Sequence, residues 1–302
     1  MKTILILRDR PSTSMFYAID HYVLQWKADG YRVIDHIGPV DVPMADILIV
    51  HINLTVIPQV YVDIISKFPL VINGNILDIS RRNFSKLLLS ESDDYTGTVI
   101  VKTNTNYGGK PEYDRLKQRH ILNTPIKDIF QLPILNSLVK KPIRQLINKI
   151  GNKRPLQKWE RIKTMNPLAY PIYKDIKSVP KGIWRNTNLI AERYINNCEN
   201  GLFYAFCCVF FGDKEIAGRL GSPNPIVKYS NSVSVELLPA PDIVRQWRKD
   251  LKIDFGRFDY LEFEGQYFLI DVNKTEGGGL DICYDYQDEF TYLAAGLEYY
   301  LK

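Results

Sequence analysis

The sequence predicts an α/β protein whose first part is a small doubly wound unit. From residue 1 to 76, apolar runs of strand length alternate with helical patterns, as is typical of a parallel sheet covered by helices. Farther along the chain, β-rich runs are joined by short turns, which favours antiparallel hairpins. With 302 residues, 45% of them hydrophobic, the chain can form two or three compact units.

The N-terminal unit is expected to contain four strands and two helices. The continuous apolar run 2–7 is typical of a buried parallel strand. The remaining expected elements are strands at 31–37, 46–52 and 70–73 and helices at 14–29 and 58–67. No GxGxxG pattern follows the first strand, where Arg8 to Pro11 stand instead, so a dinucleotide site is not supported.

A basic helix is expected next, over residues 78–90. Its charged residues include Arg81, Arg82 and Lys86. Either all of these side chains form a solvated face of the helix, or one of them binds an anion. Both interpretations stay open.

A strand that ends in a lysine follows this helix. Residues 98–102, TVIVK, end in Lys102, and the polar, glycine-bearing loop 103–109 comes directly after. Backbone N–H groups of such a loop can surround phosphate oxygens while the ammonium supplies positive charge. The loop is not a P-loop, because GxxxxGK[ST] is absent.

The segment 110–184 is rich in proline and in basic residues, and a helix is expected over 142–150. Between Lys110 and Lys163 there are fourteen Lys or Arg and four Asp or Glu, while the rest of the chain has 25 basic and 30 acidic residues. The segment could clamp an acidic substrate, bind nucleic acid or form a solvated excursion. Few aromatic residues lie among the central cations, so a nucleic-acid partner is disfavoured. We expect the segment to lie beside the nucleotide cleft and to help bind a negatively charged substrate through Lys140, Lys141 and Arg144.

The C-terminal part should combine antiparallel hairpins with two helices. Residues 188–195 form a predicted strand, and Glu199 follows Glu192 by seven places. The other expected elements are a hairpin of 202–211 with 215–220, an amphipathic helix at 239–252 and a closing helix at 290–301.

The most informative stretch is a second hairpin, formed by 258–263 and 266–272. Asp259 lies on its first strand, Asp271 on its second, and Asn273 two places farther on the same face as Asp271. A two-residue turn at Glu264 and Gly265 would put the two carboxylates on opposite faces, whereas a three-residue loop with a bulge would put them on one face. Glycine after a polar residue favours the second form. Two carboxylates and an amide oxygen on one face would form a site for Mg²⁺.

Composition restricts where the protein works. The apolar stretch at the N-terminus is too short for the core of a signal peptide, and no apolar run of membrane-spanning length occurs. The four cysteines have no CxxC spacing and the four histidines are scattered, which disfavours a zinc site. We therefore expect reduced thiols in a cytoplasmic protein.

Three of these motifs together resemble the ATP-grasp superfamily. Arg257-x-Asp259, a hairpin and then Asp271-x-Asn273 with a small-residue loop resemble its C-terminal metal site. VIVK with a glycine-containing loop resembles the start of its lid, and the strand 188–195 resembles its interdomain hinge. The chain departs from the family in having Asp271 where Glu is usual, and in its long basic insertion.

The resemblance implies a three-part organisation and a nucleotide site. The units would be an N-terminal α/β domain at 1–76, a lid subdomain at 77–187 with the basic insertion 110–184, and a C-terminal subdomain at 188–302. ATP phosphates would be bound by Lys102 with Arg82 or Lys86. Backbone groups of Arg193 and Ile195, beside Glu192, would bind adenine, and Glu199 would bind ribose.

The resemblance also implies an activity. Asp259, Asp271 and Asn273 would hold Mg²⁺, and Arg257 with the backbone of Gly277 and Gly278 would stabilise an oxyanion. The expected enzyme is an ADP-forming ligase that joins a carboxylate to an amine or thiol through an acyl phosphate. No general base is evident in the sequence. The expected acceptor is a small molecule or peptide with negative charge, and a homodimer is possible. The alternatives are an ATP-grasp kinase acting on a hydroxyl and a nucleotide-binding protein without catalysis.

Overall fold

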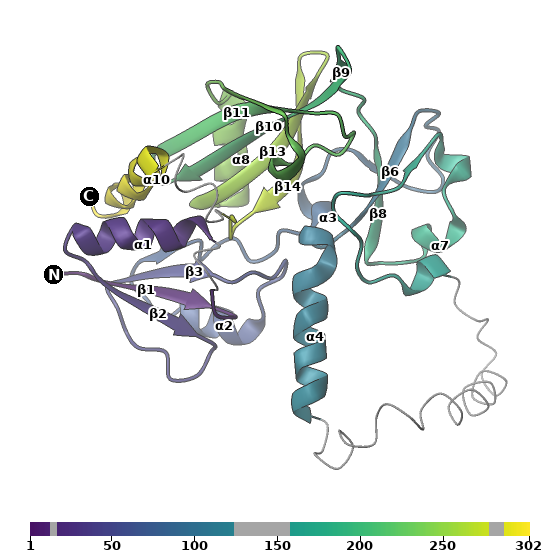
Figure 1. The fold of residues 1–302 in the computed structure, drawn as a ribbon. Helices are drawn as coiled ribbons and strands as arrows, with labels where there is room; N and C mark the ends of the chain where they lie inside the picture. The colour runs from purple at the N-terminus through teal and green to yellow at the C-terminus, as the bar shows by residue number, and fades with distance from the viewer. Residues whose placement is uncertain (13–16, 124–157, 278–286) are drawn as a thin grey trace.

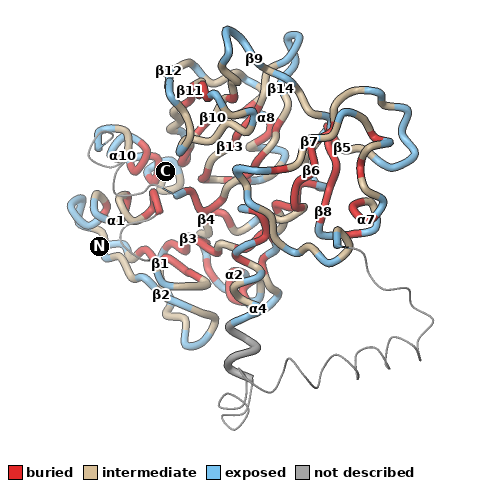
Figure 2. The backbone as a smooth tube through the Cα atoms, turned by 45° about the vertical axis from the view of Figure 1, so that its right-hand side comes forward, coloured by how far each residue is buried: buried red, intermediate tan, exposed pale blue. Residues whose placement is uncertain are grey.

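The chain folds around three sheets in the computed structural model, which describes residues 1–12, 17–123, 158–277 and 287–302 (Figure 1). Buried residues concentrate in the strands of these sheets, while many connecting segments are exposed (Figure 2). In the described residues, no helix combines the length and apolar character needed to cross a membrane. The mixed α/β architecture confirms the predicted fold class.

The N-terminal sheet is parallel, with the strand order β2-β1-β3-β4. Its elements are β1 (Thr3–Arg8), α1 (Ala18–Ala28), β2 (Arg32–Ile37), β3 (Ile47–His51), α2 (Gln59–Ile65) and β4 (Val71–Ile72). Both of its faces are buried, because Ile4 and Ile6 pack with α1 while Leu5 and Leu7 pack with α2. This double cover explains the continuous apolar run in β1.

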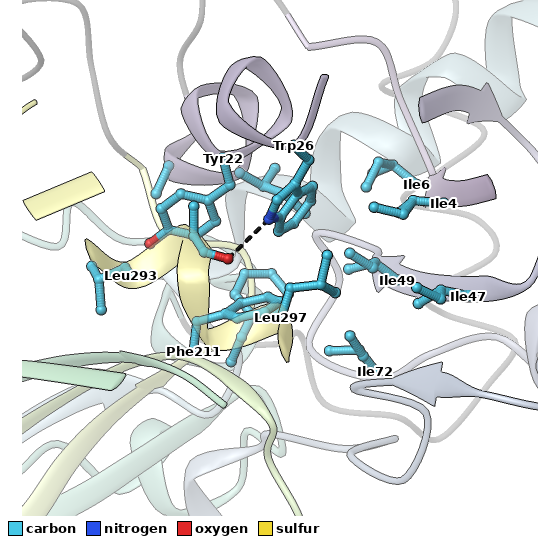
Figure 3. Packing of buried hydrophobic residues seen from close by; sticks show 14 of the residues in the cluster. Ile4, Ile6, Tyr22, Trp26, Ile47, Ile49, Ile72, Phe211, Leu293 and Leu297 are labelled. Atoms are coloured by element: carbon cyan, nitrogen blue, oxygen red, sulfur yellow. Dashed lines mark hydrogen bonds between the residues drawn. The ribbon is translucent and has the colours of Figure 1, made fainter. Parts of the chain in front are cut away.

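Helix α1 also connects this unit to the C-terminal end of the chain. It packs against α10 (Gln287–Ala294) and the 3-10 turn η5 (Ala295–Tyr300), as Figure 3 shows. The indole N–H of Trp26 donates a 2.9 Å hydrogen bond to the carbonyl of Ala294. The predicted helix at 290–301 thus begins earlier, and its second half is a 3-10 turn.

The middle sheet is antiparallel, with the order β5-β8-β6-β7. The part of the chain that forms this sheet has the elements α3 (Arg81–Phe84), β5 (Leu88–Leu89), β6 (Val99–Thr103), η1 (Tyr107–Gly109), α4 (Lys110–Asn123), η2 (Lys158–Arg161), β7 (Ile172–Tyr173), η3 (Ile176–Ser178), α7 (Lys181–Trp184) and β8 (Leu189–Arg193). Strand β8 belongs to this sheet, whereas we expected residue 188 to begin the third unit. The helix expected at 142–150 lies outside the described residues.

The expected helix over 78–90 is wrong, because only the single turn α3 forms there. Ser85 is already extended, and Leu88 and Leu89 pair with β8 as an edge strand. The three consecutive leucines are accommodated better by this sheet than by a short helix with only one apolar face.

The third sheet is antiparallel and carries the predicted metal hairpin. Its order is β12-β11-β10-β13-β14, with β9 paired to β10. The strands are β9 (Cys198–Glu199), β10 (Leu202–Phe211), β11 (Lys214–Ser222), β12 (Ser234–Leu237), β13 (Phe255–Phe263) and β14 (Gln266–Asn273), accompanied by η4 (Tyr229–Asn231). Helix α8 (Asp242–Leu251) covers one face with Val244 and Trp247. The other face points toward α1 and the N-terminal sheet, and it carries the site described next.

Candidate active site

The hairpin β13–β14 brings Asp259 and Asp271 to directly opposite positions. Its turn is the two-residue form, since Glu264 and Gly265 both have positive φ (52° and 73°) and Phe263 pairs with Gln266. The expected three-residue loop is therefore wrong. A bulge instead shifts the register between Asp259 and Tyr260, so that Ile270 is the extra residue of β14. This bulge places the two carboxylates on one face of the sheet.

Every oxygen of the two carboxylates is paired with a cationic side chain. The ammonium of Lys228 lies 3.3 Å from Asp259 Oδ2 and 3.2 Å from Asp271 Oδ2. Arg257 Nε donates to Asp259 Oδ1 at 2.7 Å, and Arg81 donates to Asp271 Oδ1 at 2.7 Å. Burial alone would raise the pKa of Asp259, but the charges of Arg257 and Lys228 lower it below its ordinary value. Asp259 therefore carries its charge at neutral pH.

Arg81 is a site residue that the sequence did not single out. Its guanidinium is buried and also donates to the carbonyls of Thr103 and Thr105, which ties α3 to the loop after β6. The two residues that we expected to compete for a phosphate, Arg82 and Lys86, are exposed. Arg82 donates to the backbone carbonyls of Thr187 and Leu189 at the start of β8, and neither Arg82 nor Lys86 lines the two cavities described below.

Lys102 lies at the wall of a narrow pocket. Its ammonium is 2.8 Å from the fully buried carboxylate of Glu192, across the β6–β8 ladder. The pair therefore joins Lys102, which we expected to bind phosphate, to Glu192 on the strand that we expected to form the hinge. Lys102 lines the pocket, whereas Glu192 does not.

This narrow pocket, named the cleft pocket, lies between the middle and third sheets. Apolar side chains dominate its lining, among them Leu87, Ile100, Ala205, Leu261 and Ile270. Arg193, Tyr194 and Ile195 line it as well. The amides of Arg193 and Tyr194 already donate to Leu87 and Thr98 carbonyls, whereas that of Ile195 donates to no described residue.

Glu199 does not reach the cleft pocket. It is exposed at β9, and its carboxylate pairs with Arg219 at 2.6 Å. A movement of β9 would be required for this acid to bind a ribose in the pocket.

A wide cavity of about 850 Å³ adjoins the cleft pocket. The two spaces share four residues, Arg81, Tyr170, Lys228 and Asp271, which we name the junction. Asp259, Asn273, Arg257 and Gly277 line the wide cavity beyond the junction. The bulge residue Ile270 lines the pocket on one side, while Asp271 reaches the junction.

The described part of the basic segment lines the opposite wall of the wide cavity. Helix α4 contributes Lys110, Tyr113, Asp114 and Lys117, and residues 164–168 contribute the adjoining wall. Helix α4 starts beside α3 and runs away from the three sheets (Figure 1). Lys140, Lys141 and Arg144 lie outside the described residues.

The loop after β14 is held by the N-terminal unit. The hydroxyl of Thr275 donates to Asn53, the amide of Ala18 donates to the carbonyl of Glu276 at 3.0 Å, and Gly277 forms a bridge with Tyr17. Gly277 thus lies at the cavity with its backbone position defined. Gly278 lies outside the described residues.

Two solved structures are similar to essentially the whole chain. D-Cycloserine synthetase DcsG matches with a TM-score of 0.52 and 11% identity, over 99% of this chain and 100% of that one. D-Alanine–D-alanine ligase of Bacillus anthracis in complex with ATP matches with a TM-score of 0.50 and 10% identity, over 100% of this chain and 96% of that one. The chain has the ATP-grasp fold. No protein-family model and no curated protein matches the sequence.

An ATP-grasp fold implies a magnesium ion, and the donor set of this site fits one. Asp259, Asp271 and Asn273 all line the wide cavity, and carboxylate and amide oxygens are the ligands that Mg²⁺ prefers. The ammonium of Lys228, bridging both carboxylates, already holds positive charge where the ion would bind. Asn273 Oδ1 accepts a 2.7 Å hydrogen bond from Asn106, which orients it. Among the described residues no cluster of three His, Cys, Asp or Glu side chains is suited to a metal, so any ion here depends on the amide as well.

Proposed function

We propose that this protein is an ADP-forming ligase that activates a carboxylate as an acyl phosphate and joins it to an amine. The observation that supports it best is the junction, where a pocket lined mainly by apolar residues meets a large cavity lined by many charged side chains, at two cations and a carboxylate. A nucleotide has this division of character, with a flat apolar base at one end and transferable phosphate at the other. The ATP-grasp fold is the second support.

In this proposal the base of ATP occupies the cleft pocket. Its apolar walls suit a purine, and the amide of Ile195, which donates to no described residue, suits an acceptor nitrogen on the edge of the ring. Lys102 would contact the phosphates from the pocket wall, and Glu192 would keep its ammonium in place. The terminal phosphate would reach the junction, where Arg81 and Lys228 would bind its oxygens.

The first step would transfer this phosphoryl group to a carboxylate in the wide cavity. An oxygen of the carboxylate attacks phosphorus while ADP leaves, and the residues act mainly by positioning the groups and neutralising charge. Arg81 and Lys228 lie where negative charge spreads over the transferring oxygens. Magnesium bound by Asp259, Asp271 and Asn273 would supply further neutralisation. Lys110 and Lys117 on the far wall would attract the anionic substrate.

The second step would be attack of the amine on the acyl phosphate. Negative charge then develops on the carbonyl oxygen, and the guanidinium of Arg257 and the amide of Gly277 both border the cavity where it forms. A cavity of about 850 Å³ has room for a carboxylate and an acceptor together, which favours a ligase over a kinase with one small acceptor.

The test is a screen for carboxylate-dependent ATP turnover by the full-length chain. The protein is incubated with Mg²⁺-ATP and pools of carboxylic acids, and ADP release is measured with and without hydroxylamine. Hydroxylamine converts an acyl phosphate into a hydroxamate, so the proposal expects ADP and hydroxamate in equal amounts. A stable phosphorylated product without hydroxamate would identify a kinase instead. ADP release that Asp259→Asn leaves unchanged would show that the turnover does not come from this site.

A further inference from the structure

A second pocket, of about 170 Å³, lies on the third sheet beside α10. Its lining is mainly aliphatic and aromatic, from Val209, Ile216, Leu220, Val235, Leu237 and Phe290. We name it the β10–β12 pocket. The proposed ATP and carboxylate sites do not use it.

This pocket adjoins the wide cavity where acyl transfer would occur. The two spaces share Tyr229, Arg257 and Gly277. Two of these, Arg257 and Gly277, are the residues assigned above to the carbonyl oxygen. A molecule bound in the β10–β12 pocket would therefore have one end beside the reacting carbonyl carbon.

Two carboxyl groups, those of Glu276 and Glu289, line this mainly apolar pocket, and Glu276 directly precedes Gly277, which also lines the wide cavity. Glu276 is only 8% exposed, and its side chain makes no hydrogen bond to any described residue. Its backbone is held through the hydrogen bond from Ala18, so the side chain starts from a defined position. Burying a carboxylate without a partner is costly, so the site favours a ligand that brings a positive charge.

The groups around Glu276 determine its protonation. From the third sheet it faces Arg257, Asp259 and Cys207, from α1 Tyr22, and across the pocket Glu289 of α10. Burial raises its pKa to about 8, with Asp259 acting in the same direction and Arg257 against it. A group with this pKa gains and releases a proton near physiological pH.

We propose that the β10–β12 pocket binds the acceptor as an amine with a small aliphatic group, and that Glu276 pairs with its ammonium and takes its proton. The transfer step rests on the proposed ligase function, whereas amine binding does not. Glu276 would supply the general base that is not evident in the sequence.

The proton balance of the step is complete. The ammonium gives one proton to the Glu276 carboxylate and becomes a neutral amine. Its nitrogen forms a bond to the acyl carbon, the bond from that carbon to the phosphate oxygen breaks, and the second amine proton leaves with inorganic phosphate. Glu276 then releases its proton to solvent.

Binding is tested first, with isobutylamine as the probe and isobutanol as its neutral counterpart. Calorimetry on the full-length chain should show isobutylammonium binding that strengthens by about tenfold from pH 6.5 to pH 8.5, because Glu276 is ionised above its pKa. Glu276→Gln should abolish this pH dependence and weaken amine binding at least tenfold, without changing isobutanol binding. Equal amine affinity in the wild type and Glu276→Gln would overturn the assignment.

The pocket itself is tested by filling it from its rim. Val235→Trp changes a 46% exposed residue at the edge of the pocket, so the fold should tolerate it. It should block both probes, while Val233→Trp, at an exposed residue outside the lining, should not. Probe binding that survives Val235→Trp would place the ligand elsewhere.

The transfer step is tested with the carboxylate found in the ADP screen. Hydroxylamine is neutral at pH 7 and needs no base, so Glu276→Gln should lower the ratio of isobutyl amide to hydroxamate at least tenfold. Glu276→Asp should restore part of it. An unchanged ratio would refute the base role even if the ligase activity is real. Absence of hydroxamate in the wild type would refute the ligase instead, and the binding experiment would still decide the pocket.

Discussion

Lys228 provides the sharpest test of the junction, because one ammonium contacts two carboxylates there. Replacing it by methionine keeps the length of the side chain and removes the charge. A hydrogen bond to a charged group contributes about 1.5–3 kcal/mol, and breaking a buried pair costs about 3–5 kcal/mol. Here Asp259 and Asp271 each keep an arginine, and Lys228 is 26% exposed. We therefore expect Lys228→Met to lower the free energy of unfolding by about 2 kcal/mol in EDTA.

Magnesium should change this result in a specific direction. In the wild type Mg²⁺ must displace the ammonium from both carboxylates, whereas in Lys228→Met the oxygens are already available. A tenfold tighter Kd adds about 1.4 kcal/mol at saturating Mg²⁺. The stability difference between the two proteins should therefore shrink to below about 1 kcal/mol in excess Mg²⁺.

The assay is thermal unfolding of both proteins in EDTA and in excess Mg²⁺. The change in EDTA corresponds to a lower Tm by on the order of 4 °C. Lys249→Met, at an exposed lysine of α8, is the matched control and should behave as the wild type in both buffers. A destabilisation of the same size in EDTA and Mg²⁺ would show that the metal does not compete with Lys228. No destabilisation at all would refute the bridging ion pair.

Four further outcomes follow from the same geometry. Asp259→Asn and Asp271→Asn should each abolish Mg²⁺-dependent ATP turnover with the fold retained in circular dichroism, and full turnover in both would remove the metal site. Lys102→Ala should weaken ATP binding at least tenfold by calorimetry; wild-type affinity would make Lys102 a structural partner of Glu192 only. Arg81→Met should reduce ADP formation at least a hundredfold while Arg82→Met, an exposed neighbour, retains most of it, and the reverse order would return the phosphate role to Arg82. Because the pKa of Asp259 is lowered in the folded protein, its contribution to stability is complete above the unfolded value and is lost as pH falls through the folded value. Asp259→Asn should therefore flatten the acid side of a stability–pH curve, and an unchanged acid side would refute the paired carboxylate.

Most of the longer strands and their order along the chain were predictable because their signals are local, whereas the short strands β5, β7, β9 and β12 were not predicted. The continuous apolar run of β1 reports a strand covered on both faces, and the amphipathic pattern of α8 reports a helix with one buried face. Gly265 after Glu264 correctly marked a turn. The ATP-grasp resemblance rested on the order of such motifs, and the fold confirms it.

The residues of the junction were not predictable in the same way. Arg81 stands in a run of basic residues, and nothing in that run distinguishes it from Arg82. In the structure Arg81 is buried and Arg82 is exposed, because the single turn of α3 directs the two side chains differently. Lys228 lies in a loop between β11 and β12, forty-three residues before Asp271. Glu276 stands in the small-residue loop after Asn273, and no sequence pattern distinguishes it as a site residue.

The sequence by itself determined the alternation of strands and helices in the N-terminal unit, the hairpin with its two carboxylates, and the lysine near the end of β6. These depend on spacing between residues that are neighbours in the chain, and side-chain periodicity reports them directly. Only the tertiary structure decided which face each carboxylate takes, through the bulge at Ile270, and which cations reach them. Both outcomes depend on contacts between segments far apart in the sequence, where packing and charge balance across three sheets select one side chain among several local candidates.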